Sequence, residues 1–341
     1  MNKIEKARLL KISLFTLFII TIGYFFYIIF YPFNNISLST LLYDTGRFSG
    51  LVAFVMLSFL IFLGDTARYW DRIIGLDKTI VFNKKFSLVI LVFALIHPIS
   101  FMISSSAIMH YIIPDFTILP LALGIVAFYI FIGVMIASAI YKRISYTIWQ
   151  YIHISTYLLF FFTLYHAFNW GSDSNDLFVK GIYLLFLIGI AIGIVYRTSY
   201  KILQRSNKYT VKNIRWETKD VFTLVLKQKN KLKFKAGQFC FLRLNKDKLY
   251  ARHPFTISNS PEDDDLEFTI KLEGRFTKIA SELKKGEEVI LEGPFGTFTL
   301  EDNDKDLIFF AGGVGITPFR SIIKNQLNNN DKMNIALLYG C

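Results

Sequence analysis

Cysteine is scarce in this chain of 341 residues, which has two cysteines, Cys240 and Cys341. Neither has a second cysteine at the Cys-x-x-Cys spacing typical of zinc sites, so a structural zinc site is not indicated. We interpret both as structural or incidental. The residues before the first hydrophobic run also lack the calcium-binding loop of an EF-hand, so regulation by calcium is not indicated.

Charged residues are rare in the first two hundred positions, although the whole chain has a mean hydropathy of +0.42 and 53% hydrophobic residues. The first hydrophobic run is too long for a cleaved signal peptide, and no small-residue cleavage site follows it. The sequence therefore predicts an all-α six-helix transmembrane bundle. Its six stretches approach the roughly 20 residues that a spanning helix needs, and they cover about residues 10–30, 48–64, 86–113, 116–141, 145–170 and 177–196.

Basic residues are distributed unevenly between the connections of these stretches. Fifteen lysines and arginines fall on one side of the predicted bundle and two, Arg47 and Lys180, on the other. The positive-inside rule makes the rich side cytoplasmic, which predicts a multi-pass cell-membrane protein with both termini in the cytoplasm. Both cysteines then lie where thiols stay reduced. The part up to Lys208 carries +9 of the net +12, so the remainder is near balance and nucleic-acid binding is not indicated.

Histidine occurs as two pairs inside the apolar stretches, His97 with His110 and His153 with His166, and both pairs have the same spacing, i to i+13. Ionisable side chains are costly in a bilayer and mark functional sites there. At 1.5 Å per residue this spacing separates two levels by ~20 Å, so we predict an inner haem held by His97 and His153 and an outer haem held by His110 and His166. A metal or proton path, or four hydrogen-bonded polar residues between helices, are the alternatives.

From Tyr209 onward the pattern changes to short alternating segments typical of strands, separated by turns rich in Gly, Asn, Asp and Lys. This pattern predicts a small antiparallel β-barrel. The expected domains are a transmembrane domain over 1–208, the barrel over 209–303 and an incomplete α/β nucleotide-binding domain over 304–341. The expected strands are YTVKNIRW, VFTLVLKQ, QFCFLRL, LEFTIKL and EEVILEG.

Glycine-rich turns precede two predicted helices in the second half. Free backbone N–H groups at a helix start attract phosphate, so a pyrophosphate could lie at the turn where Thr277 is the expected helix cap. The apolar strand Leu307 to Ala311 leads into GGVGITP, where Thr317 is the expected N-cap and Pro318 suits the first turn. Taken alone, these glycines could simply make tight turns.

Together, the paired histidines, the segment HPFTIS, the turn GPFG and the loop GGVGITPF resemble the NADPH oxidase and ferric reductase superfamily, over about residues 40–341. In that superfamily a haem-containing membrane domain precedes a ferredoxin-reductase-like flavin and nicotinamide module. The resemblance implies an FAD site at His253, Pro254, Phe255, Thr256, Ser258, Lys271, Gly274 and Thr277. It implies an NAD(P)H site at Gly312, Gly313, Gly315, Thr317 and Pro318.

Arg47 resembles an arginine near the outer haem of the superfamily, where it could meet the substrate, although a snorkelling anchor is an equal alternative. The resemblance implies electron transfer from NADH or NADPH through FAD and two b-type haems to an acceptor outside. Flavin accepts a pair of electrons and releases them singly, which a one-electron haem requires. The lightly charged outer loops hold no acidic cluster, which favours oxygen, giving superoxide, over ferric iron.

The chain ends after what resembles the second strand of a nucleotide-binding domain, which usually has about six strands. Roughly half of that domain is therefore missing from the pattern, and NADH cannot be told from NADPH. If the chain is a fragment, the expected protein is a self-sufficient enzyme. If it ends at Cys341, a haem conduit fed by a separate reductase partner is the alternative.

Overall fold

The structure is a computed structural model that describes residues 3–31, 37–141, 143–204, 208–228, 230–244, 252–300, 306–329 and 333–340. Cys341, one of the two cysteines interpreted as structural or incidental, lies outside these residues. The chain divides into two compact units. The first comprises Met1–Ala67 with Lys78–Arg197, and the second comprises Arg68–Asp77 with Thr198–Cys341.

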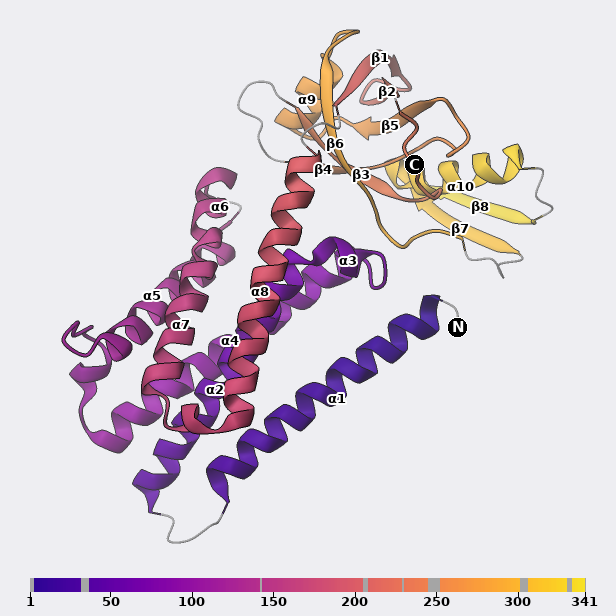
Figure 1. The fold of residues 1–341 in the computed structure, drawn as a ribbon. Helices are drawn as coiled ribbons and strands as arrows, with labels where there is room; N and C mark the ends of the chain where they lie inside the picture. Colours follow the sequence, from indigo (N-terminus) through magenta and orange to yellow (C-terminus); the bar gives the residue numbers. More distant parts are fainter. Residues whose placement is uncertain are drawn as a thin grey trace. The chain divides into compact units, whose positions relative to one another are not determined.

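The first unit is helical (Figure 1). Its long helices are α1 (Lys3–Phe30), α2 (Leu38–Asp65), α4 (Leu76–Ser105), α5 (Leu119–Ala139), α6 (Tyr146–Ile154), α7 (Thr156–Trp170) and α8 (Leu177–Gln204). Short 3-10 turns cover Ile108–Tyr111 (η1) and Ser172–Asn175 (η2). Among the described residues, α1, α2, α4, α5 and α8 are long and apolar enough to cross a membrane.

The predicted span 145–170 is divided between α6 and α7, so five of the six predicted spans correspond to described helices with the length and composition of a spanning helix. Ser145 caps α6 by accepting a hydrogen bond from the backbone N–H of Ile148 at 3.2 Å. The two helices meet at Ser155, whose hydroxyl donates to the carbonyl of Ile152 at 2.6 Å. This local hydrogen bond competes with the regular backbone hydrogen bonds of an α-helix. Each of the two helices is too short to span a membrane alone.

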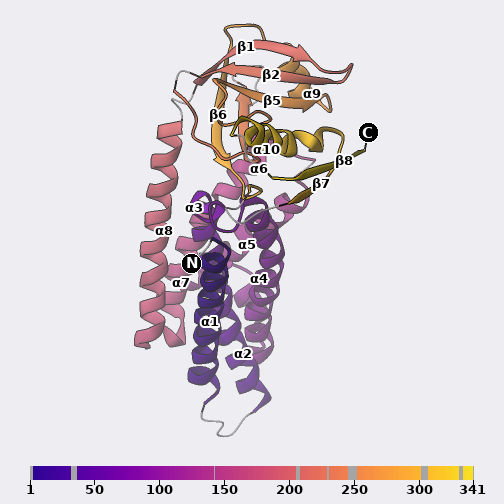
Figure 2. The same ribbon diagram turned by 90° about the vertical axis from the view of Figure 1, so that its right-hand side faces the viewer.

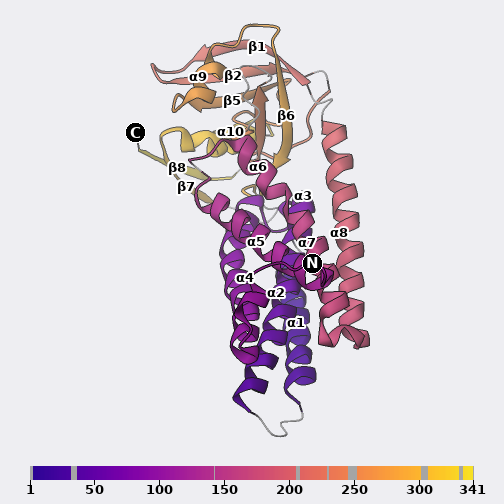
Figure 3. The ribbon, with the colours of Figure 1, turned by 90° about the vertical axis from the view of Figure 1, so that its left-hand side faces the viewer.

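The core of the first unit is built around α2, which carries the buried side chains of Leu51, Val52, Phe54 and Met56. Phe54 packs on Phe160 of α7, with their ring centroids 6.0 Å apart. Helices α5 and α7 lie against each other, and α1 lies against α2 (Figures 2 and 3). Burial of these apolar side chains holds α2 and α7 at fixed positions beside the histidines.

The second unit contains a six-stranded antiparallel sheet in the order β4-β3-β6-β1-β2-β5. Side chains alternate between buried and half-exposed along β3, which puts Cys240, Leu242 and Leu244 in one core. The predicted strands are confirmed within two residues at each start. The strands are β1 (Lys208–Trp216), β2 (Val221–Lys227), β3 (Phe239–Leu244), β4 (His253–Thr256), β5 (Asp265–Lys271) and β6 (Glu288–Phe295).

The sheet is open where a barrel was predicted, because the edge strands β4 and β5 share no ladder of hydrogen bonds. Strand β4 has four residues, and its Pro254 has no N–H to donate to a further strand. The short helix α9 (Arg275–Ser281) contributes the buried Phe276 and Ala280 to the core of this sheet.

The last part of the second unit is a parallel β–α–β arrangement. Strand β7 (Leu307–Gly312) pairs in parallel with β8 (Ile335–Gly340). The 3-10 turn η3 (Gly313–Ile316) and helix α10 (Thr317–Asn328) form the crossover between them. The glycine loop thus leads directly from a strand into a helix, the arrangement that the sequence predicted.

The segment Arg68–Asp77, which contains most of the short helix α3 (Ala67–Asp71), belongs to the second unit although its neighbours in the sequence belong to the first. Trp70 and Asp71 are buried. The carboxylate of Asp71 accepts hydrogen bonds from the backbone N–H groups of Leu76 at 2.8 Å and Gly296 at 3.1 Å. A buried carboxylate with such donors fastens this segment to the turn that ends β6.

Candidate functional site

The first unit contains a cavity of about 230 Å³ between α2, α4, α5 and α7, and His97 and His166 both lie on its wall. Their ring centroids are 6.1 Å apart with the ring planes at 84°. His97 comes from α4 and His166 from α7. Apolar side chains, including Leu51, Phe54 and Ile125, form much of the remaining wall.

Both imidazoles are oriented by backbone carbonyl groups. Nδ1–H of His97 donates to the carbonyl of Gly46 at 2.8 Å, and Nδ1–H of His166 donates to the carbonyl of Pro120 at 2.9 Å. A neutral imidazole that donates through Nδ1 keeps a lone pair on Nε2, and metal-binding histidines in proteins commonly have this second hydrogen bond. The two rings are therefore in the tautomer that binds a metal through Nε2.

The separation of the two rings suits a haem iron between them. A metal–imidazole bond is about 2.0 Å long and Nε2 lies about 1.2 Å from the ring centre, so two opposed ligands place their centroids about 6.4 Å apart. The observed 6.1 Å is close to that value. The spacing of the two rings therefore agrees with the spacing that a single haem iron between them would require.

Two glycines make room for these rings. A Cβ atom at Gly50 of α2 would lie 2.5 Å from Nδ1 of His97, and one at Gly124 of α5 would lie 2.5 Å from Nδ1 of His166. Both distances are shorter than any van der Waals contact. Neither glycine stood out in the sequence, although each belongs to a predicted spanning helix.

The pairing of histidines around this cavity differs from the predicted one. The sequence predicted His97 with His153 and His110 with His166, whereas the structure brings His97 and His166 together. Helix α4 begins at Leu76 and ends at Ser105, well before the end of the predicted span 86–113. His97 therefore lies in the second half of its helix. His166 lies in the second half of the α6–α7 pair, so these two are at the same level.

The other two histidines are absent from the cavity wall among the residues that the structure describes. His110 lies beyond the end of α4, in the turn η1, and is exposed. His153 is exposed near the end of α6, with its ring stacked on Trp149 at a centroid distance of 4.9 Å. Their roles as haem ligands remain predictions.

Arg47 of α2 lines the cavity and is held by two carboxylates. Its Nη1 donates to Asp44 at 2.8 Å, and its Nε and Nη2 both donate to Asp173, with Nε at 3.1 Å. Such a two-pronged contact fixes the plane of a guanidinium group. The sequence pointed to Arg47 but not to Asp173, which follows α7 closely in the chain and is also on the wall.

In the second unit, the predicted flavin segment and the turn before α9 come together. The ring of His253 stacks on Phe276 of α9 at a centroid distance of 4.1 Å, and Phe255 stacks on the same ring at 5.8 Å. Partial burial lowers the pKa of His253, so its imidazole is neutral at pH 7. Thr256 is half-buried at the end of β4.

Ser258 is fully buried, and its hydroxyl group donates to the backbone carbonyl of Glu267 at 3.0 Å. The hydroxyl of Thr269 in turn donates to Ser258 Oγ at 3.1 Å. This side chain therefore supports the sheet beside the flavin segment. A direct contact with flavin, as the resemblance implied for Ser258, remains a prediction.

The predicted pyrophosphate turn differs in its capping. Gly274 is the N-cap of α9, and Thr277 stands at the third helical position, where its hydroxyl accepts hydrogen bonds from the N–H groups of Glu273 at 2.9 Å and Gly274 at 3.1 Å. The expected cap is thus three residues out of place, although Thr277 still satisfies backbone donors at the helix start. Lys271 lies at the end of β5 with Nζ 3.9 Å from Asp220.

The predicted nucleotide loop lies between β7 and α10. Gly312 ends β7, Gly313 adopts a positive φ of 50°, and Gly315 lies within η3. Thr317 was predicted to be the N-cap, but the N-cap is Ile316 and Thr317 is the first residue of α10. Pro318 follows in the first turn. The hydroxyl of Thr317 donates to the carbonyl of Val314 at 3.0 Å, which fixes the loop to the helix.

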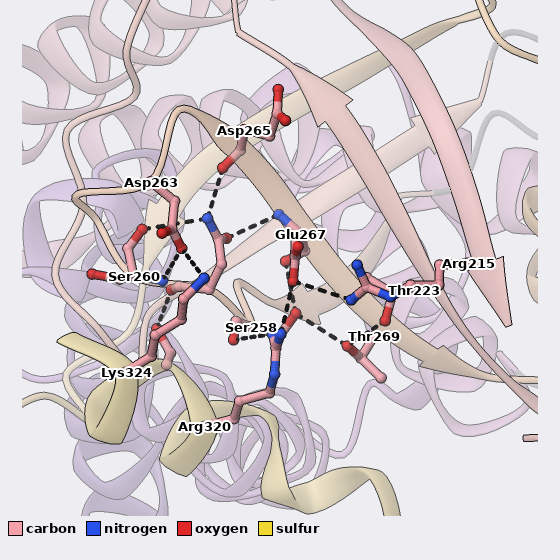
Figure 4. Close-up of polar contacts among 12 residues, drawn as sticks. Arg215, Thr223, Ser258, Ser260, Asp263, Asp265, Glu267, Thr269, Arg320 and Lys324 are labelled. Atoms are coloured by element: carbon pink, nitrogen blue, oxygen red, sulfur yellow. Dashed lines mark hydrogen bonds and ion pairs between the residues drawn. The ribbon is translucent and has the colours of Figure 1, made fainter. Parts of the chain in front are cut away.

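A polar cluster that the sequence did not reveal joins α10 to the segment after β4 (Figure 4). Arg320 and Lys324 extend from α10 toward Glu267 and Asp263, which they contact at 2.9 Å and 2.7 Å. The signal in the sequence is the i to i+4 spacing of these two cations, which places them on one side of a helix.

Three family models match successive parts of the chain. A "ferric reductase like transmembrane component" matches residues 49–164, an "FAD-binding domain" matches 206–299, and an "oxidoreductase NAD-binding domain" matches 309–341. The order agrees with the fold, since the first model covers the cavity helices and the other two cover the sheet and the glycine loop.

Similar proteins include oxidases and reductases. The chain is 27% identical to a superoxide-generating NADPH oxidase heavy chain of Dictyostelium discoideum over 57% of this chain and 30% of that protein. It is 28% identical to "Respiratory burst oxidase homolog protein F" of Arabidopsis thaliana, over 38% and 16%. It is 33% identical to the "Flavodoxin/ferredoxin--NADP reductase" of Buchnera aphidicola, over 39% and 56%. The chain thus spans less than two thirds of each relative.

Among solved structures, a ferredoxin-NADP+ reductase of Plasmodium falciparum matches this chain with 22% sequence identity and a TM-score of 0.36. The match covers 40% of this chain and 62% of the reductase chain.

Proposed function

Because the chain belongs to the superfamily of ferric reductases and NADPH oxidases, we propose that it is a transmembrane oxidoreductase that takes electrons from NADH or NADPH through FAD and haem. The observation that carries the proposal is the facing pair of His97 and His166 in an apolar cavity. The basic residues between the helices support cytoplasmic termini, so the acceptor would lie on the opposite side.

The same geometry supports one haem with two histidine ligands. Helices α4 and α6–α7 cross in the same direction, and His153 precedes His166 along the second of them. On α4 the position at the same interval of 13 residues before His97 holds Lys84, and the residue before it is Asn83. The side-chain oxygen of Asn83 is buried and has no hydrogen-bond partner among the described residues. Neither residue is an imidazole, so His153 has no counterpart on α4.

His97 and His166 would hold the haem, which would supply one-electron redox chemistry in this site. The chain's own residues then determine how an acceptor approaches. Arg47, oriented by Asp44 and Asp173, stands on the cavity wall and presents a fixed positive charge there. We propose oxygen as the acceptor and superoxide as the product, because the lightly charged outer loops offer no cluster of acidic ligands for ferric iron.

The test is the absorption spectrum of the detergent-purified protein, recorded oxidised, then with NADH or NADPH under anaerobic conditions, then with dithionite. Haem and flavin are quantified in the same sample. We expect one low-spin haem per chain, reduced by a nicotinamide when FAD is present. Reduction by dithionite alone would instead favour a conduit fed by a partner reductase, and absence of haem would refute the proposal.

Substitution of the histidines tests the haem assignment separately. His97→Leu and His166→Leu should each remove the low-spin spectrum, whereas His110→Leu, with its exposed side chain, should retain it. Superoxide formation is then compared with reduction of a ferric chelate. A spectrum with two low-spin haems per chain, one of them lost in His110→Leu, would contradict the single-haem assignment and support the pairs predicted from the sequence.

A further inference from the structure

One side of α10 is fastened to the segment that continues the predicted flavin site. This latch face consists of Arg320, Ser321, Lys324 and Asn325. Arg320 and Ser321 bond to backbone carbonyl groups, while Lys324 and Asn325 bond to side chains. All of these partners lie between residues 258 and 267 of the second unit, which includes the turn between β4 and β5.

Arg320 makes the contacts nearest to the flavin segment (Figure 4). Its Nη1 donates to the carbonyl oxygen of Ser258 at 2.6 Å, and its Nη2 donates to Oε2 of Glu267 at 2.9 Å. Ser258 itself is fully buried and its backbone N–H donates to the carbonyl of Glu267 at 2.8 Å. One guanidinium group therefore holds both the segment that follows β4 and strand β5.

Two other residues of the latch face, Ser321 and Lys324, also bind the segment after β4. The hydroxyl of Ser321, which is fully buried, donates to the carbonyl of Asn259 at 2.6 Å. Nζ of Lys324 donates to Asp263 at 2.7 Å. Because a buried polar group costs free energy when it loses its partner, the bond of Ser321 helps to keep α10 in one position on the sheet.

The latch face joins two sites that the sequence separates. Strand β4 with the predicted flavin residues ends two residues before Ser258. Helix α10 begins at Thr317, which the glycine loop precedes, so Arg320 is in its first turn. A shift of α10 therefore moves the nucleotide loop relative to β4, and transfer rates respond steeply to displacements of about 1 Å between reacting groups.

We propose that Arg320 is a positioning residue, which sets the placement of the nicotinamide loop against the flavin segment by holding Ser258 and Glu267. This inference rests on the proposed function, since it assumes that FAD and NAD(P)H occupy the two sites. It concerns the approach of the nicotinamide to the flavin, during which a hydride leaves the nicotinamide and reduces the flavin. Arg320 itself acts through Ser258 and the sheet.

The test compares Arg320→Met with Lys324→Met in the purified holoprotein. Both cationic side chains are 38% exposed and both hold a carboxylate, but Lys324 contacts the turn at Asp263 and leaves the Ser258 carbonyl alone. Reduction of bound FAD by NADH and NADPH is followed by anaerobic stopped flow. The charge-transfer absorbance between reduced nicotinamide and oxidised flavin is recorded in the same traces.

We expect Arg320→Met to slow flavin reduction by at least about tenfold and to weaken the charge-transfer absorbance. FAD content and reoxidation of the flavin by ferricyanide should not change. Lys324→Met should stay within about twofold of wild type. Arg320→Lys keeps the charge but loses the fork of donors, so it should recover part of the rate. It also replaces Arg320→Met if that variant fails to hold FAD.

Hydrogen–deuterium exchange of the protein without nucleotide gives a second readout, because Arg320→Met should expose the backbone N–H of Ser258. Normal reduction rate, absorbance and exchange in Arg320→Met would overturn the positioning role alone. Wild-type protein that binds FAD but is reduced by neither nucleotide would instead refute the proposed function. The two failures are therefore distinguishable.

Discussion

The absence of a Cβ atom at two glycines makes room for the imidazole rings on the cavity wall. The imidazole of His166 fits because Gly124 has no side chain, and the imidazole of His97 fits because Gly50 has none. Packed interiors do not absorb an added methyl group without displacement of a neighbour. Nothing in the sequence distinguishes these two glycines, because the ring that fills the space above each of them comes from a distant part of the chain.

Gly124→Ala should therefore displace the ring of His166 and lower the haem content of the purified protein. Overpacking of this kind costs about 1–3 kcal/mol, which corresponds to a hold on the ligand that is weaker by about fivefold to about a hundredfold. The measurement is haem per chain from the pyridine haemochrome spectrum. Gly133→Ala is the matched control, because it lies on the same helix and a Cβ there has nothing within 4 Å. Equal haem content in both variants would contradict the argument.

Cys240 shows how burial suppresses the chemistry of a side chain. Its thiol is fully buried in the sheet, and burial raises its pKa to about 12, against a smaller opposing effect of Arg68. At pH 8 about one thiol in ten thousand is ionised, and the thiolate is the reactive form. This supports the prediction that Cys240 has a structural role.

In a Cys341→Ser background, iodoacetamide at pH 8 should label Cys240 at least about a hundredfold more slowly in native than in unfolded protein. Mass spectrometry of the labelled chain measures both rates. Rapid labelling of the native protein would show that the sheet opens around β3 or that the thiol is ionised.

Secondary structure elements differ in how well their limits follow from sequence. The strands of the sheet alternate buried and exposed side chains, so β2, β3 and β5 were predicted within two residues. Hydropathy located the membrane helices but not their ends. Helix α4 begins ten residues before the predicted span and ends eight before its predicted end. The structure brings the ring of His97 beside that of His166, and the pairs predicted from the sequence stay predictions as haem ligands.

The break between α6 and α7 could not be predicted from composition either, because the residues on both sides of Ser155 are apolar and helical. The same holds for contacts between elements. Asp65 at the end of α2 accepts hydrogen bonds from Tyr157 of α7 and from Arg197 of α8, the latter at 3.1 Å. The carboxylate of Asp65 is almost fully buried, so three helices depend on one carboxylate.

Asp65→Leu should destabilise the first unit by about 3 kcal/mol, the lower end for breaking a buried pair, because Arg197 can still turn toward solvent. The measurement is the midpoint of thermal unfolding in detergent. The double variant Asp65→Leu with Arg197→Leu should regain part of the loss, since it leaves no unpaired cation. Strictly additive losses would show that the two residues do not interact.

At the scale of the whole molecule, the order of functional regions followed from the sequence, because each region has its own composition and motif. Placement of side chains within each region did not follow, since it depends on contacts between residues far apart in the chain. Arg320 with Glu267 and Arg47 with Asp173 are such contacts. Neither pair is visible in any local pattern.

The segment Arg68–Asp77 has a practical consequence for cutting the chain. The backbone passes between the two units after Ala67, after Asp77 and after Arg197, so no single cut separates them. A soluble fragment that starts at Thr198 would lack Trp70 and Asp71, and the backbone N–H of Gly296 would lose its carboxylate partner.

The free energy of unfolding of such a fragment should be about 3 kcal/mol lower than that of a second fragment, in which residues 68–77 are attached to Thr198 through a glycine–serine linker. The first fragment lacks one large buried apolar side chain and one charge-assisted hydrogen bond. Equal denaturation midpoints of the two fragments would contradict this. To express the second unit alone, residues 68–77 should therefore be joined to its N-terminal end. This segment, most of which lies between α2 and α4 in the sequence, then supplies the side chains that the six-stranded sheet would otherwise lack.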